Sequence, residues 1–270
     1  MTQPTTAPDS TAGYQVAPIQ RAPTAAQWRT AAMRSYGRGV LYWFNRGQGR
    51  ITMQGVTRGY GANNAIFLPP RTMHGFEMMG QVNGTAVFLP DEPDLLWPET
   101  ILHLRVRDVQ HQAELTAMVD NLRREISRDD PARARALRYH AGLLSVWLER
   151  QAATSGQEEV EPRRAADRLA AAFTALVERD FRNGAGVAHY AARLGVTPTH
   201  LSRACRAASG RPASALLQDR VHYEARWLLA ETRSPVKKVA EQLGFRSAAY
   251  FTRAFHAHTG QTPSEFRKHG

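Results

Sequence analysis

The spacing of apolar residues divides the chain into a part typical of β-strands and a later part typical of α-helices. Between residues 31 and 104, short apolar runs alternate with turns rich in glycine, proline or asparagine; the runs are 40–44, 50–54, 65–70 and 85–90. In the first run, alternation places Val40, Tyr42 and Phe44 on one face of the strand. Leu41 and Trp43 then lie on the other face, so both faces are apolar, as expected for a wall between a cavity and a second layer. Short strands at this spacing predict a small antiparallel barrel or sandwich.

Two stretches after residue 108 have the periodicity of amphipathic helices. In the first, apolar residues recur every three or four positions, at Leu115, Val119, Leu122 and Ile126. Asp129-Asp130-Pro131 interrupts this pattern, and a second stripe continues to residue 150. The two stretches predict a helical hairpin. The stripes have two interpretations: they cover the β part of the same chain, or the first of them forms the seam of a homodimer.

The last third of the chain contains an internal repeat. Residues 187–210 align with residues 236–260, at an offset of 49 before the turn and 50 after it. Each copy predicts a short helix, a turn glycine and a second helix, which is a helix-turn-helix. The second helix of such a unit enters the major groove of DNA. The helix expected over residues 214–231 would span roughly 27 Å and hold the two units about one turn of DNA apart.

The exposed positions of the two second helices are the candidate DNA contacts. They are Thr199, Ser202, Arg203 and Arg206 in the first copy, and Ser247, Ala248, Ala249, Tyr250, Thr252 and Arg253 in the second. Because arginine can donate two hydrogen bonds to guanine, Arg203 and Arg253 are candidates for base contacts, and the two alanines for contacts with thymine methyl groups. The alternative is that some of these arginines contact only phosphate or pair with a carboxylate.

The charge distribution supports a polyanionic partner for this region. The 270 residues include 35 Lys and Arg and 24 Asp and Glu, a net charge of +11. From residue 163 onward there are 18 basic and 8 acidic residues, a net of +10, whereas residues 1–162 have 17 and 16, a net of +1. Solvated arginines could explain the preference for arginine over lysine, but they do not explain this asymmetry. We therefore expect double-stranded DNA to bind the C-terminal part.

The composition of the segments, together with the elements above, predicts how the chain is divided into domains and linkers. We predict a flexible leader over residues 1–27, a β domain over 28–107, a helical hairpin over 108–150, a polar linker over 151–162 and a DNA-binding domain over 163–270. No run of eighteen apolar residues and no secretion signal are present, so we expect a soluble, cytoplasmic protein with no membrane partner. The single cysteine, Cys205, excludes an intramolecular disulfide and is expected to be a packed core residue.

The sequence contains no motif for catalysis, so we expect no enzymatic activity, no metal and no cofactor. HExxH, Walker and GxSxG motifs are missing, and the residues flanking His74 supply no second metal ligand. Gly47-Gln48-Gly49 lies between two apolar runs and predicts a hairpin turn rather than a phosphate-binding loop.

Four residues are candidates for binding a small-molecule effector: Arg38, Tyr42, Trp43 and His74. Arg38 shares the Tyr42 face of its strand and would place a cation beside an aromatic wall, which suits an aromatic or other organic acid. Alternatively, Arg38 is a solvated strand start and the other three residues belong to the core.

From about Arg168 to Lys268 the chain resembles the AraC/XylS family of bacterial transcription regulators. The resemblance lies in LSR at 201–203, Gly210, Arg220, VAEQLGF at 239–245, YFTRAF at 250–255 and GQTPSEFR at 260–267. Many members of this family carry a cupin-like sensor barrel and a dimerising helical pair before the helix-turn-helix units. PPRTMHGF at 69–76 is similar to a strand ending of such barrels.

The resemblance implies an α+β chain: an N-terminal cupin-like antiparallel β-barrel with a helical hairpin, followed by an all-α domain with two helix-turn-helix units. It implies a homodimeric regulator that responds to a small-molecule effector, is more often an activator, and has RNA polymerase as a further partner. Two alternatives remain open: a cupin-type metalloenzyme fused to a DNA-binding tail, and a DNA-binding protein without an effector.

Overall fold

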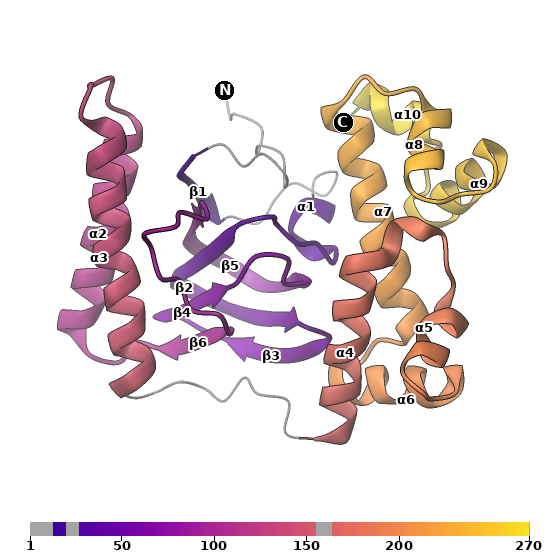
Figure 1. The fold of residues 1–270 in the computed structure, drawn as a ribbon, viewed down its shortest axis with the longest axis horizontal. Helices are drawn as coiled ribbons and strands as arrows, with labels where there is room; N and C mark the ends of the chain where they lie inside the picture. Colours follow the sequence, from indigo (N-terminus) through magenta and orange to yellow (C-terminus); the bar gives the residue numbers. More distant parts are fainter. Residues whose placement is uncertain (1–12, 20–26, 155–163, 270) are drawn as a thin grey trace.

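The N-terminal half of the chain is an antiparallel sheet. The computed structural model describes residues 13–19, 27–154 and 164–269, and the predicted leader and linker lie largely outside these ranges. The strands are β1 (Gln15–Ile19), β2 (Gly39–Met53), β3 (Val56–Tyr60), β4 (Asn64–Leu68), β5 (His74–Leu89) and β6 (Leu102–Arg105). Their order is β1-β5-β2-β4-β6, with β3 paired to β2 (Figure 1). A short helix, α1 (Trp28–Ala31), packs on β5.

Two local predictions about this half were wrong. Gly47-Gln48-Gly49 does not make a hairpin turn, because β2 continues through it with shifts of register against β5. Gly47 has a φ of +90°, which glycine adopts without strain, so the strand absorbs an irregularity instead of ending. Part of the predicted flexible leader is also a strand, since β1 pairs with β5 from Gln15 to Ile19.

The sheet separates two hydrophobic cores, so both apolar faces of residues 40–44 are covered by packed side chains, where a cavity was expected on one of them. Tyr42 and Phe44 belong to an aromatic core that also contains Ile51 and Phe76, from the second half of β2 and the first half of β5. The Phe44 ring lies 5.8 Å from that of Phe76 and 4.1 Å from that of Tyr60. Since both halves of the long strands contribute to one core, the sheet curves around it. Leu41 and Trp43 lie on the other face, in a second core.

A helical hairpin covers this second face (Figure 1). Helices α2 (Val109–Ile126) and α3 (Arg133–Thr154) pack on each other and on the sheet. The stripe that was a candidate dimer seam lies in this core: Leu115, Val119 and Leu122 are buried, and Ile126 packs against them. The Trp43 indole also donates a hydrogen bond to Thr116 on α2, at 3.2 Å. The first stripe therefore covers the sheet of its own chain rather than facing a partner.

The C-terminal half is helical. It comprises α4 (Ala165–Asp180), the 3₁₀ turn η2 (Phe181–Asn183), α5 (Val187–Arg193), α6 (Pro198–Ser209), α7 (Ala213–Glu231), α8 (Val236–Gln242), α9 (Ala248–Thr259) and α10 (Pro263–His269). Figure 1 shows α5 and α6 near one end of α7, and α8 and α9 near the other. Residues of the sheet half, Met33, Val56 and Met73, extend into the core of this helical half.

Buried polar contacts also join the two halves. The backbone N–H of Met33 donates to Asp219 Oδ2 on α7 at 2.9 Å. The Ser35 hydroxyl donates to Glu178 on α4 at 2.5 Å, and Arg220 donates to both carboxylate oxygens of Glu178. None of the described helices is long and apolar enough to cross a membrane.

Candidate functional site

The turn between α5 and α6 is built from local signals in the sequence. Gly195 has a φ of +68°, and the next backbone N–H, of Val196, donates back to the carbonyl of Ala191 at 3.0 Å. The Thr197 hydroxyl caps α6 by accepting from the backbone N–H of His200, and Pro198 occupies the first turn. Helix α6 therefore begins at Pro198 with a capped first turn.

The turn between α8 and α9 has the same construction. Gly244 has a φ of +73°, Phe245 N–H donates to the Ala240 carbonyl at 2.9 Å, and the Ser247 hydroxyl caps α9 through the Tyr250 N–H. Helices α6 and α9 both end at a glycine with a φ of +75°, Gly210 and Gly260. The sequence repeat therefore corresponds to a repeat in three dimensions.

One face of α6 and α9 is buried and the opposite face carries the candidate DNA contacts. Leu201 and Cys205 on α6 correspond to Phe251 and Phe255 on α9, and all four side chains are fully buried. Of the candidates, the exposed residues are Thr199, Arg203, Arg206, Ser247, Ala249, Tyr250 and Arg253, while Ser202, Ala248 and Thr252 are half-buried. Burial raises the pKa of the Cys205 thiol to about 12, so it stays protonated, as a packed core residue would.

Two candidate hydroxyls have partners within their own helix. Ser247 caps α9, and the Thr252 hydroxyl donates to the Ala248 carbonyl at 2.9 Å. Both side chains therefore have structural roles in α9, which leaves the exposed Arg253 and Tyr250 as the larger polar groups on this face.

The four effector candidates do not form one site. Tyr42 and His74 are brought together: His74 Nδ1–H donates to the Thr72 carbonyl, so Nε2 accepts from the Tyr42 hydroxyl at 2.8 Å. Both side chains lie in the aromatic core, where burial and the nearby Arg34 cation hold the pKa of His74 well below its usual value. This pair is consistent with a satisfied polar contact inside the core.

Arg38 borders the same aromatic core at Phe88, whereas Trp43 lies outside it. Arg38 is only 4% exposed, so neither the solvated strand start nor an open anion site describes it. Its guanidinium lies 4.8 Å from the centre of the Phe88 ring and donates to the Gly13 carbonyl and to Gln15 Oε1, at 2.8 Å each. Trp43 is on the opposite face of β2, against α2, because neighbouring residues of a strand point to opposite sides.

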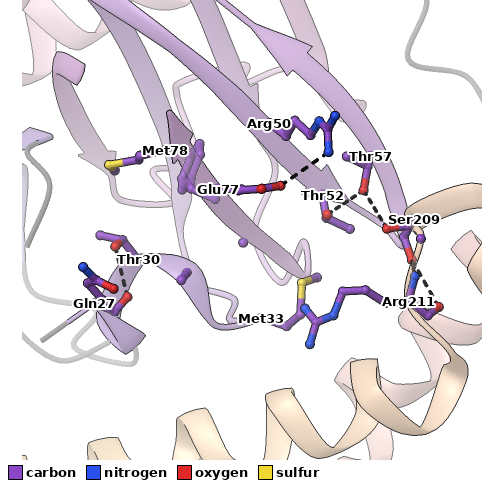
Figure 2. Close-up of a pocket in the computed structure, with 14 residues that line it drawn as sticks. Gln27, Thr30, Met33, Arg50, Thr52, Thr57, Glu77, Met78, Ser209 and Arg211 are labelled. Carbon is purple, nitrogen blue, oxygen red and sulfur yellow. Dashed lines mark hydrogen bonds and ion pairs between the residues drawn. The ribbon is translucent and has the colours of Figure 1, made fainter. Parts of the chain in front are cut away.

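A pocket of about 400 Å³ lies between the sheet and the helical half (Figure 2). We call it the interface pocket; its lining residues are Gln27, Thr30, Ala31, Met33, Arg50, Thr52, Thr57, Gly75, Phe76, Glu77, Met78, Ser209, Gly210 and Arg211. Thr52, Thr57 and the carbonyl of Ser209 are joined by hydrogen bonds of 2.7 and 3.4 Å, which link the sheet to the end of α6. Its walls come from segments far apart in the chain, so no local pattern in the sequence marks this pocket.

Two arginines bring positive charge to the interface pocket. Arg50 lies 3.8 Å from Glu77, and both side chains are largely exposed. Arg211 extends toward Met33 (Figure 2). Its Nη1 donates to Asp219 Oδ2 at 3.1 Å. With Phe76, Met33 and Met78, these groups form a wall that is partly apolar and partly cationic.

Asp219 connects the interface pocket to α9. It accepts from Met33 and Arg211 on the pocket side, and its Oδ1 lies 3.6 Å from His258 Nε2 on α9. Burial tends to raise the pKa of Asp219, but the contacts from His258, Arg211 and Met33 hold it below its usual value. The ionised carboxylate thus joins three segments that are distant in the sequence.

The described residues contain no group of three or more His, Cys, Asp or Glu side chains arranged to hold a metal ion. A second cavity, of about 560 Å³, lies between the loop before α5, α7 and the α8–α9 pair; its walls include Phe181, Gly184, Leu217, Leu243 and Phe245.

Comparison with known proteins relates the helical half to transcription regulators. Residues 190–269 match a family model described as a helix-turn-helix domain. The chain is 35% identical over 81 residues to the arabinose operon regulatory protein of Escherichia coli, which covers 30% of this chain and 28% of that protein. It is 38% identical over 77 residues to the uncharacterized HTH-type transcriptional regulator YfiF of Bacillus subtilis, covering 28% and 24%. The chain thus spans less than a third of the length of these curated relatives.

Among solved structures, ToxT from Vibrio cholerae O395 aligns over 94% of this chain and 96% of its own, at 14% identity and a TM-score of 0.41. The C-terminal domain of AraT, a response regulator from Geobacillus stearothermophilus, aligns over 41% and 88%, at 24% identity and a TM-score of 0.36. Both curated relatives are described as regulators. Over about 80 residues, the chain is therefore similar to helix-turn-helix transcription regulators.

Proposed function

We propose that this protein is a sequence-specific DNA-binding transcription regulator that places α6 and α9 in successive major grooves. The observation that carries this proposal is the repeated geometry of the α5–α6 and α8–α9 pairs, each with one buried face and one exposed, arginine-bearing face. Arg203 and Arg253 occupy equivalent places on those exposed faces. Each pair then acts as one helix-turn-helix unit, and α7 sets the distance between them.

Affinity and specificity come from different groups in this proposal. The net charge of +10 over residues 163–270 supplies a strong attraction to phosphate that does not depend on sequence. The side chains on α6 and α9 supply the base contacts, with arginine to guanine as the strongest single discrimination.

The experiment is selection of bound fragments from a random DNA library by the full chain, followed by footprinting of the selected sequence. We expect a motif with two conserved boxes about one helical turn apart, and protection of two successive major grooves on one face of the duplex. A motif with a single box, or protection of one groove only, would contradict the proposal.

We further propose that the regulator responds to a small organic acid bound in the interface pocket. The pocket offers cations at Arg50 and Arg211 beside the apolar side chains of Met33, Phe76 and Met78, which suits an aromatic acid. A ligand there contacts both the sheet and the turn that ends α6. Through Arg211 and Asp219 it also reaches His258 on α9, so it can favour one arrangement of the DNA-binding helices over another.

The regulator is also proposed to be a homodimer, with the outer face of α3 as its contact surface. Tyr139, Leu143 and Val146 are 65%, 60% and 41% exposed and recur at helical spacing, forming what we call the α3 stripe. In an antiparallel pair of α3 helices centred near Leu143, Arg135 at one end of the stripe faces Glu149 of the second copy, and the charges are complementary.

A further inference from the structure

The two turn glycines at equivalent places in the repeat have different surroundings. Gly195, between α5 and α6, has no atom within 4 Å of the position that a Cβ would occupy. At Gly244, between α8 and α9, the same position lies 2.3 Å from the backbone nitrogen of Gly184 and 2.5 Å from the carbonyl oxygen of Arg182. The two glycines have nearly equal φ values, +68° and +73°, so the turn conformation explains why both positions are glycine. Only Gly244 is also in close contact with a distant segment.

Gly184 completes this contact from the other side. A Cβ on Gly184 would lie 2.1 Å from the carbonyl oxygen of Gly244. The contact is between two stretches of backbone, so no flexible side chain can move aside to accommodate a larger residue. It joins the loop that precedes α5 to the turn that precedes α9, and thus one helix pair to the other.

The loop around Gly184 is held firmly in place. Phe181 is buried beneath the guanidinium of Arg220, which lies 3.9 Å from the ring centre. Arg182 donates to Glu224 on α7 at 2.5 Å, and Arg220 bonds the same carboxylate at 3.0 Å. The loop is therefore fixed to α7, and Gly244 packs against a rigid support.

Both helix pairs also pack on α7. Helices α5, α6 and α8 do so directly, and on α9 the His258 ring stacks 4.3 Å from that of His222. The second cavity, about 560 Å³, is lined by Gly184 and Gly244 together with Phe181, Leu217 and Phe245. The backbone contact is thus a direct constraint between the two helix pairs, in addition to their packing on α7.

We propose that Gly184 and Gly244 are specificity-determining residues, whose backbone contact sets the separation and angle of α6 and α9 and so the DNA spacing that the protein accepts. This inference rests on the proposed two-groove DNA binding. It assigns the choice of spacing to two residues that present no side chain to DNA.

The test compares Gly184→Ala with Gly195→Ala in the full chain. Both variants place alanine at a left-handed φ, +71° and +68°, so both carry the same local strain, but only Gly184→Ala adds a clash with the Gly244 backbone. Each protein selects from a random DNA library, and is then titrated on the wild-type motif with its boxes at the selected spacing, one base pair closer and one base pair farther apart.

We expect the wild-type protein and Gly195→Ala to prefer the selected spacing by about tenfold or more, because a displaced recognition helix loses its base contacts. Gly184→Ala should lose this preference or move it to another spacing, while still binding each box. Equal spacing preferences in the two variants would overturn the inference. A wild-type motif with a single box would instead refute the proposed function, so the two failures are distinguishable.

A second variant covers the case in which Gly184→Ala does not fold, as judged by its circular dichroism spectrum. Arg182→Ala removes the contact with Glu224 from a side chain that is half exposed and adds no atom to the glycine contact. It should broaden the accepted spacing to within about threefold across the three DNAs, compared with about tenfold for the wild type. An unchanged preference in Arg182→Ala would then overturn the inference.

Discussion

The surroundings of each arginine decide its role in this chain. Arg220 is 3% exposed, donates to Glu178 and Glu224, and covers Phe181, so it stabilises the junction of α4, η2 and α7. Arg253 belongs to the same residue type but lies exposed on α9. Sequence alone identifies both as basic residues, whereas burial separates the structural cation from the candidate DNA contact.

Arg253→Ala should weaken binding to the selected DNA by about 1–3 kcal/mol and leave binding to random DNA nearly unchanged, since a base contact is lost but most phosphate contacts remain. The measurement is fluorescence anisotropy with both DNAs at one salt concentration. Arg128→Ala, on an exposed side chain of the hairpin, is the matched control and should change neither affinity. Equal losses on the two DNAs would identify Arg253 as a phosphate contact.

The buried His222 is expected to make the folded protein less stable at acidic pH. Burial, with His258 and Arg226 nearby, lowers the pKa of His222 from 6.5 to about 3, despite the opposing effect of Asp219. The unfolded chain therefore binds a proton below pH 6.5 that the folded chain does not bind. His222 therefore leaves the free energy of unfolding unchanged above pH 6.5 and lowers it as the pH decreases toward 3. At pH 5 the free energy of unfolding is lower by about 2 kcal/mol.

The check is chemical denaturation at pH 7.5 and pH 5. His222→Phe retains a flat ring beside His258, whose ring lies 4.3 Å away, but cannot take up a proton. This variant should lose about 2 kcal/mol less than the wild type on acidification. The exposed His256→Phe serves as control and should behave like the wild type; an unchanged acid response in His222→Phe would refute the assignment.

Among the elements, those built from local signals agree best with the sequence. The two helix pairs lie where the repeat predicts them, with α5 and α6 within residues 187–210 and α8 and α9 within residues 236–260. Strands β2 and β5 are longer than the predicted apolar runs, because Gly47 and Gly84, which lie between or next to those runs, are inside strands. A strand can absorb an irregularity when its neighbour continues the pairing, and that neighbour is distant in the sequence.

The two faces of the helical hairpin predict different consequences of mutation. Leu122→Ala should lower the free energy of unfolding by about 2–5 kcal/mol, since this fully buried side chain packs in the core between the hairpin and the sheet. Leu143→Asp, on the α3 stripe, should leave the fold intact and weaken dimerisation by about 100-fold, because a symmetric contact loses two leucines.

Sedimentation velocity over a concentration series measures the second effect. Val109→Asp is the control, since Val109 is 76% exposed but lies at the start of α2, outside the α3 stripe. A wild-type protein that stays monomeric, or a dimer that Leu143→Asp does not weaken, would refute this contact surface.

At the scale of the whole molecule, the sheet and the helical half share a packed boundary. Met33 illustrates this, since its side chain belongs to the core of the helical half while its backbone N–H donates to Asp219. The interface pocket lies at this boundary, so a ligand there would act on both halves at once. The connection from Arg211 through Asp219 to His258 extends the boundary to α9.

Binding of aromatic acids tests the proposal that the interface pocket holds a small organic acid. Benzoate, 3-phenylpropionate and 2-naphthoate are compared with their uncharged amides, by the shift in melting temperature of the full chain. We expect at least one acid to raise the melting temperature by several degrees near saturation and its amide to have little effect, because the amide lacks the charge that Arg211 pairs with.

Arg211→Met should abolish the shift, while Arg128→Met, far from the pocket in the hairpin, should retain it. Stabilisation that persists in Arg211→Met, or the absence of stabilisation by all three acids, would contradict binding at this pocket.

The amino-acid sequence by itself determined the β-then-α order, the paired repeat and the concentration of positive charge after residue 163. These features depend on neighbours within a few residues or on composition, so they are readable along the chain. Only the tertiary structure decided that Arg38 is buried on Phe88, that the first hairpin stripe faces the sheet, that residues 27–78 and 209–211 enclose one pocket, and that Gly184 meets Gly244. Each of these depends on packing between segments distant in sequence, which local patterns do not encode.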